Sequence, residues 1–253
     1  MSPTPVALPP ALPSELFTYI LTHQTYPTTA IICQPRSTFL SALLTSIPQT
    51  LQARPPPPPS AEAFSDPHSE PTSDPPPLHP LLVPTLHQIA TSRHINLVFV
   101  PTLSHLRAYL AVFSTEEDKG PPEKTFDKPG KKSPLLIVYG LLELHRDTSE
   151  WSAQGLGNSI AGLVEAGWRT GRKVVILEER GMGDDSSDIG LEESRKNRIK
   201  IWEEGVPMLN GSVRRAGLES EDGGWSGRTV EVGRILARWF KFEKGDWDDD
   251  EYD

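Results

Sequence analysis

The stretch Leu135-Leu136-Ile137-Val138-Tyr139-Gly140 decides the fold class of this chain. An apolar run of this length, ended by a glycine, is typical of a β-strand that is buried on both faces. A second such run is Lys173-Val174-Val175-Ile176-Leu177. Between them, Leu156, Ile160 and Leu163 share one face of a predicted helix. A strand, a helix and a strand in this order predict a parallel pair joined by a helical crossover.

The same alternation extends toward the N-terminus. Apolar runs at 28–33 and 95–100 predict two more strands. Helical spacing of apolar residues occurs in four other segments, at 14–21, 39–47, 82–90 and 103–113. Ser14 and Ser149 are the predicted N-caps of the first helix and of the long helix that ends at Gly171. The chain is therefore expected to be an α/β protein, with a mainly parallel sheet and helices on both faces.

The last third of the chain gives weaker signals. A short basic helix is predicted at 195–202 and a strand at 206–213. The segment 229–242 fits two periods, because Val232, Ile235 and Leu236 have helical spacing while alternate residues also fit a strand with a bulge at Gly233. Its β-branched and aromatic residues favour the strand, which is the interpretation adopted.

Composition divides the chain into one domain with three polar segments. Of 253 residues, 26 are proline, and the hydrophobic share is 36%. Both values predict an ordinary core together with unfolded segments. We expect a single domain over 1–253, with a disordered proline-rich insertion at 54–77, a surface loop at 114–133 and a disordered acidic tail at 245–253.

Several classes of protein are excluded by composition. The only cysteine is Cys33, so neither an intramolecular disulfide nor a cysteine-only zinc site is expected. The histidines show no metal-binding spacing, and no metal or cofactor is predicted. No secretory signal or membrane-spanning stretch is recognisable. The net charge of −9 argues against wholesale electrostatic binding of nucleic acid, and leaves room for a local basic patch.

The positions expected to bind a nucleotide lack the necessary residues. Phosphate binding after the first core strand needs glycines and a lysine, but the sequence at 34–38 is Gln-Pro-Arg-Ser-Thr. Pro35 also lacks an N–H donor. A magnesium-binding aspartate would stand at the end of an apolar strand, where this chain has Tyr139. Catalytic ATP hydrolysis is therefore not expected, although Arg36, Ser37 and Thr38 leave weak anion binding open.

Basic residues concentrate late in the chain and are the predicted DNA contacts: Arg195, Lys196, Arg198, Lys200, Arg214, Arg215, Arg234 and Arg238. Backbone phosphates are the natural target of such a group. The alternative is a solvated face whose cations pair with Glu203, Glu204 and Glu231. Trp239 and Phe240 are predicted either as core residues or as a partner-binding surface, where aromatic residues are favoured.

The order of these elements resembles the RecA/Rad51-like core. Residues 28–44 stand where that family has its phosphate loop, 135–140 resembles its acid-bearing strand, and Gly233-Arg234-Ile235-Leu236-Ala237-Arg238-Trp239 is similar to a late segment. Both ATP-binding motifs of the family are missing. Degenerate Rad51 paralogues in Shu-type complexes similarly lack them. The resemblance implies a nuclear pseudo-ATPase in homologous recombination and DNA repair, which binds a paralogue or another recombination protein and single-stranded DNA.

Two other functions remain open. One is a scaffold subunit of a tRNA-modifying Elongator-type complex, in which case the protein could be cytoplasmic. The other is an unrecognised enzyme that uses Glu178, Glu179 or His145 in a cleft at the strand ends. Such an enzyme would show carboxylates with perturbed pKa values.

Overall fold

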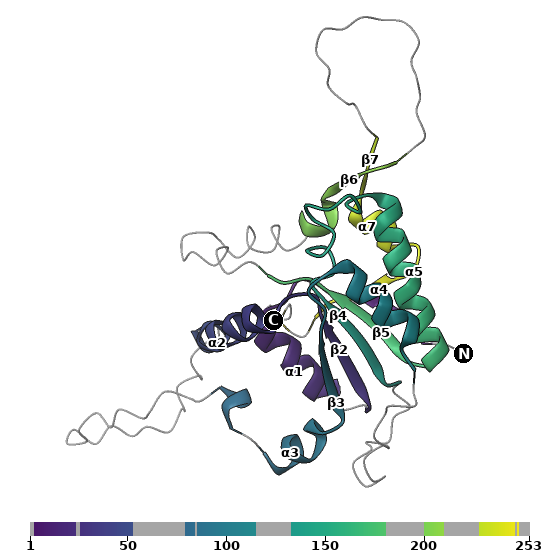
Figure 1. Ribbon diagram of the computed structural model, residues 1–253. Coiled ribbons are helices and arrows are strands. Elements are labelled where there is room, and N and C mark those ends of the chain that lie inside the picture. The colour runs from purple at the N-terminus through teal and green to yellow at the C-terminus, as the bar shows by residue number, and fades with distance from the viewer. Residues whose placement is uncertain are drawn as a thin grey trace, which may run out of the picture.

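Six parallel strands form the main sheet of this protein (Figure 1). The computed structural model describes residues 3–23, 26–52, 79–83, 85–114, 133–180, 200–209, 228–245 and 247. The strand order is β3-β2-β4-β5-β1-β8, and every neighbouring pair is parallel. From one edge to the other, the strands are β3 (Ile95–Phe99), β2 (Thr28–Ile32), β4 (Leu135–Tyr139), β5 (Lys173–Leu177), β1 (Val6–Ala7) and β8 (Lys241–Phe242).

Helices cover both faces of the sheet. On one face, α1 (Pro13–His23) and α2 (Arg36–Gln52) pack around a core that includes Phe39. On the other face lie α4 (Leu103–Val112), α5 (Ala153–Thr170) and the short α7 (Val232–Leu236), over a core that includes Leu156. The expected α/β class, with a parallel sheet between two helical layers, is confirmed.

The apolar runs occupy the middle of the sheet because both of their faces are covered. All five residues of β2 and of β4 are buried, and four of the five in β5. The register pairs Ile31 with Val138, and Val138 with Ile176. At roughly 25 cal/mol per Å² of apolar surface, burial on this scale is the main force that assembles the domain.

Both predicted helix caps are corrected by the structure. Helix α1 begins at Pro13, and the carboxylate of Glu15 accepts a hydrogen bond from the Leu12 N–H at 2.7 Å. Helix α5 begins after Ser152, whose hydroxyl accepts from the Gly155 N–H, so that Ser149 lies in the preceding turn. A left-handed glycine, with φ of 68° at Gly171, ends α5 as predicted.

The helix predicted at 82–90 is two separate elements. A short 3-10 helix, η1, spans Pro80–Leu82, and α3 spans Leu86–Ser92. Thr85 starts α3 with a capping box, in which its hydroxyl accepts from the Gln88 N–H and the Gln88 side chain accepts from the Thr85 N–H. The sequence has a proline just before Thr85, which cannot continue a helix.

The strand predicted at 229–242 is wrong, because the helical period prevails at its centre. Residues 229–231 form β7, α7 follows, and β8 begins at Lys241. Burial explains the outcome, since the three residues with helical spacing, Val232, Ile235 and Leu236, all enter the core. Gly233 is not a bulge. It lies against Trp202, whose carbonyl oxygen would be 3.0 Å from an added Cβ.

The other predicted segments are described only in part. β7 pairs antiparallel with β6 (Gly205–Pro207), which overlaps the start of the strand predicted at 206–213. Met208 and Leu209 follow β6 without strand structure, and 210–213 lie outside the described residues. The insertion at 54–77 lies outside the described residues, as does 115–132 of the predicted loop. In the predicted tail, the structure describes Gly245 and Trp247, and the Trp247 ring lies 6.2 Å from that of Tyr19. No helix in the described ranges is long and apolar enough to cross a bilayer.

Candidate functional site

The carboxyl ends of β2 and β4 define the position where a ligand is expected in such a sheet. The chain leaves β2 through α2 on one face, and leaves β4 through α5 on the other face (Figure 1). Adjacent parallel strands whose connections diverge in this way have a crevice between their carboxyl ends, where α/β proteins bind ligands. The residues that follow the two strands are Cys33 and Gln34 after β2, and Gly140 after β4.

The turn from β2 to α2 is a tight connection with no phosphate cradle. Cys33 is buried, and its N–H donates to the Tyr139 carbonyl at 2.9 Å. Burial, followed by the nearby Glu178 charge, raises the pKa of the Cys33 thiol well above its ordinary value. Helix α2 starts at Arg36, directly after Pro35. The backbone therefore enters the helix within three residues of the strand and leaves no loop that could wrap a phosphate.

Tyr139 ends β4, where a metal-binding aspartate was sought in the sequence, and it has a structural contact there. Its side chain is buried, and its hydroxyl donates to the Ala11 carbonyl at 2.9 Å. This hydrogen bond joins the end of β4 to the connection between β1 and α1. Burial raises the pKa of the Tyr139 hydroxyl well above its ordinary value, so the side chain stays neutral.

Two glutamates end β5 beside this position. Glu178 is 2% exposed, and its Oε1 atom accepts from the Leu142 N–H at 3.1 Å. Burial raises the pKa of its carboxyl from 4.5 to about 8. Glu179 is half-buried and bonded to the Gln34 side chain, and burial raises its pKa as well. The perturbed carboxylates expected of an enzyme are therefore present, but Glu178 is enclosed by protein atoms.

The charges around the strand ends do not favour a phosphate. Glu178 and Glu179 directly follow β5 and lie close to Tyr139 at the end of β4. The neighbouring cation Arg180 is paired with Glu15 at 2.7 Å, and Arg146 is paired with Glu204 at 2.6 Å. No group of three or more potential metal ligands occurs in the described part of the chain. Arg36, at the start of α2, is the exposed cation nearest the end of β2, so the described residues here offer an anion one cation and no glycine-rich loop.

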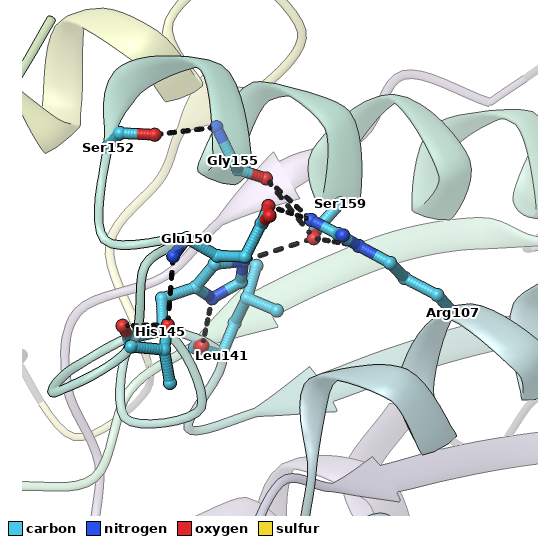
Figure 2. A network of polar contacts seen from close by, with 8 residues as sticks. Arg107, Leu141, His145, Glu150, Ser152, Gly155 and Ser159 are labelled. Carbon is cyan, nitrogen blue, oxygen red and sulfur yellow. Dashed lines mark hydrogen bonds and ion pairs between the residues drawn. The ribbon is translucent and has the colours of Figure 1, made fainter. Parts of the chain in front are cut away.

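His145 belongs to a buried polar network that the sequence did not reveal (Figure 2). Its Nδ1 lies 3.0 Å from the Leu141 carbonyl, and its Nε2 lies 3.0 Å from the Ser159 hydroxyl. A carbonyl oxygen only accepts, so Nδ1 carries the proton and Nε2 accepts from Ser159. Burial is the largest cause that lowers the pKa of His145, which keeps the ring neutral. Both His145 and Ser159 are almost wholly buried, so this pair offers no nucleophile to a substrate.

Arg107 connects the same network to α4. Its Nη2 donates to Glu150 at 2.7 Å and to the Gly155 carbonyl at 3.3 Å, and its Nε donates to Ser159 at 3.4 Å (Figure 2). These hydrogen bonds fasten the loop after β4 to α4 and α5. Only pairwise tertiary interactions define the network, and no local spacing of residues could have predicted it.

Three of the eight predicted DNA contacts lie on described residues. Lys200, Arg234 and Arg238 are exposed, whereas Arg195, Lys196, Arg198, Arg214 and Arg215 are outside the described ranges. The helix at 200–203 packs on α7 through Trp202 and Gly233, so these elements adjoin. Arg234 faces Glu231 at 3.5 Å, which is one of the acid pairings expected of a solvated face.

The two aromatic residues predicted to bind a partner have different surroundings. Phe240 is 4% exposed and belongs to the main core, so the prediction of a partner contact is corrected for this residue. Trp239 is 45% exposed. Phe242, next along the chain, is also partly exposed and packs edge-on against Trp202 at 6.0 Å.

An apolar groove lies beside β3, at the edge of the sheet opposite β8. It was not predicted from the sequence. It has a volume of about 450 Å³ and is lined by residues of α1, α2, η1, α3 and β3, including Leu43, Leu81, Ile89 and Leu97. Some of these residues, such as Leu43 and Ile89, belong to helical stripes that the sequence predicts. Which of them remain uncovered depends on how the helices pack.

The protein is an α/β protein with a parallel sheet that has helices on both faces. Its described residues contain no phosphate-binding loop after β2. Comparisons with protein-family models, with curated proteins and with solved structures found no match to this chain.

Proposed function

We propose that this protein is a non-catalytic, RecA-like subunit of a DNA recombination or repair complex, which binds a paralogous partner and single-stranded DNA. The observation that carries the non-catalytic part is the crevice at the carboxyl ends of β2 and β4. Tyr139 stands at the end of β4, where an ATP-cleaving site would need an acid, and the turn from β2 to α2 has neither glycine nor lysine. Such a site lacks the groups that position and cleave ATP.

The DNA-binding part rests on exposed cations around α7. Arg234 and Arg238 are one helical turn apart in sequence, and the adjoining helix at 200–203 begins with Lys200. The strand ends are acidic, so these cations are the described surface best suited to backbone phosphates. Arg238 forms no ion pair with another described residue and is free to contact DNA.

A charge-reversal experiment tests DNA binding. Affinity of the full chain for a fluorescent single-stranded oligonucleotide is measured by anisotropy between about 50 and 200 mM salt. The double variant R234E/R238E should bind more weakly, with the salt slope reduced by about one for each phosphate that the variant no longer neutralises. Arg93→Glu makes the charge change of one of these substitutions at an exposed site before β3 and serves as control for the single variant Arg238→Glu. Equal affinity and equal slope in wild type and R234E/R238E would remove these residues from the proposal.

Two further measurements test the rest of the proposal. Affinity purification from native cells, with mass spectrometry of bound proteins, should recover Rad51-like or other recombination proteins. Recovery of a tRNA-modification complex instead would overturn the assignment to DNA repair. Calorimetric titration with magnesium and ATP should give no binding heat, because the β2–α2 turn has no glycine. Saturable ATP binding would contradict the non-catalytic part.

A further inference from the structure

Strand β3 is an open edge of the main sheet. It pairs with β2 on one side, and no described residue pairs with its other side. The His94 carbonyl accepts from Thr28 and the Val100 N–H donates to Ile32, so the even-numbered residues direct their backbone groups toward β2. The N–H and C=O groups of the three alternate residues, Ile95, Leu97 and Phe99, therefore point outward. They form a template for another strand.

The features that normally protect an edge strand are missing from β3. Its five residues, Ile-Asn-Leu-Val-Phe, include no charge and no proline, and the register with β2 runs without a bulge. The opposite edge, β8, differs in length and in charge. It has two residues, of which Lys241 is charged, and Glu243 follows directly.

The groove beside β3 extends the same uncharged surface. The side chains of Ile95 and Leu97 point into it. The segment 37–52 contains no Asp, Glu, Lys or Arg, and in 79–100 the one such residue is Arg93, which is exposed. Large apolar side chains are exposed around it, including Leu44 at 71%, Leu86 at 87% and Ile89 at 53%. A charged occupant would lose its hydration here without gaining a partner, so the surface suits an apolar one.

Comparison of the two sheet edges indicates which strand can pair with β3. Pairing β3 of one copy with β8 of the next would match a strand of five uncharged residues with a strand of two residues that carries the charge of Lys241, and would continue without closing. Pairing β3 with β3 matches the two uncharged edges and closes after two copies. Self-pairing about a twofold axis therefore fits this surface.

We propose that two copies of this chain form a dimer through antiparallel pairing of their β3 strands, centred on Leu97. In this register Leu97 faces its own counterpart and Ile95 faces Phe99 of the second copy. The three pairs of outward residues then form about six backbone hydrogen bonds across the twofold axis. Directly opposite residues share a face, so the two grooves join into one continuous apolar surface between the copies.

The mass of the purified full chain in solution tests the dimer. Light scattering after size exclusion should give twice the 28.0 kDa of one chain at micromolar concentration. Leu97→Lys should give the single-chain mass, because it places like charges directly opposite each other. Val112→Lys is the control, since Val112 is 77% exposed on α4 and should leave the dimer intact. Thermal melting of both variants shows whether each chain stays folded.

The register has its own test, which uses the fact that the one native cysteine, Cys33, is buried. Leu97→Cys should be cross-linked to itself by a short bis-maleimide. Ile95→Cys should be cross-linked only after mixing with Phe99→Cys. A wild-type chain that stays at the single-chain mass would overturn the proposal, whether or not it binds DNA. A dimer that persists in Leu97→Lys, or that cross-links equally at all three positions, would overturn it as well.

Discussion

Replacement of Glu178 by glutamine should stabilise the fold and remove much of its dependence on pH. The Glu178 carboxyl is buried, and burial raises its pKa from 4.5 to about 8. At pH 7 the folded chain therefore holds a proton that the unfolded chain has released. Holding it costs about 3 kcal/mol, because pH 7 lies roughly 2.5 units above 4.5 and each unit corresponds to about 1.4 kcal/mol. Glutamine keeps an oxygen that can accept from the Leu142 N–H, and it carries no such cost.

The sign follows from the direction of the shift. Because the folded-state pKa of Glu178 is raised, its contribution to stability is complete below about pH 4.5, falls as the pH rises, and levels off above about pH 8. Glu178→Gln should exceed the wild type by less than about 1 kcal/mol at pH 5, by about 3 at pH 7 and by about 5 at pH 9.

Urea unfolding followed by tryptophan fluorescence measures these differences. The free energies of unfolding of wild type and Glu178→Gln are compared at about pH 5, 7 and 9. Subtracting one from the other cancels the titration of all other groups. Glu203→Gln, an exposed change in the helix at 200–203, is the control and should follow the wild type at each pH. A difference that does not grow with pH would show that Glu178 is ionised in the folded protein, and would refute the reasoning.

The remaining predictions concern packing and can be measured by urea unfolding. Tyr139→Phe removes the hydrogen bond to the Ala11 carbonyl and should destabilise the fold by about 1 kcal/mol; an unchanged midpoint would mean that the hydroxyl contributes nothing. Gly167→Ala should destabilise by about 1–3 kcal/mol, because the new Cβ would lie 2.1 Å from the Val174 side chain. Gly162→Ala in the same helix meets no atom within 4 Å and should instead stabilise by up to about 1 kcal/mol. Equal effects of the two alanines would contradict the close approach of α5 to β5.

The central strands were predictable because their sequence carries one unambiguous signal. β2, β4 and β5 are short apolar runs, and such runs fit only a strand covered on both faces. The segment at 229–242 carries two signals of similar strength. There β-propensity was misleading, because burial of Val232 and Ile235 against α5 decided for the helix.

The candidate site could be predicted only where it depends on residue identity. The missing glycines at 34–38 and the tyrosine at 139 are visible in the sequence. The burial of Glu178, the bond from Ser159 to His145 and the open edge of β3 are not. Each of these depends on which segments meet in space, and pairings between distant segments leave no trace in local periodicity.

The position of β1 has a consequence for how this chain assembles during synthesis. Val6 and Ala7 leave the ribosome before the other strands of the main sheet, yet they are inserted between β5 and β8, the two strands of that sheet made last. The earliest segment must therefore wait until most of the chain has emerged. The middle strands, β2 and β4, can pair early, whereas β1 and β8, from opposite ends of the chain, complete the sheet together. Long-range closure of this kind slows folding and keeps partly built edges exposed in the meantime, so nascent chains of this protein should depend on chaperones until β8 is released.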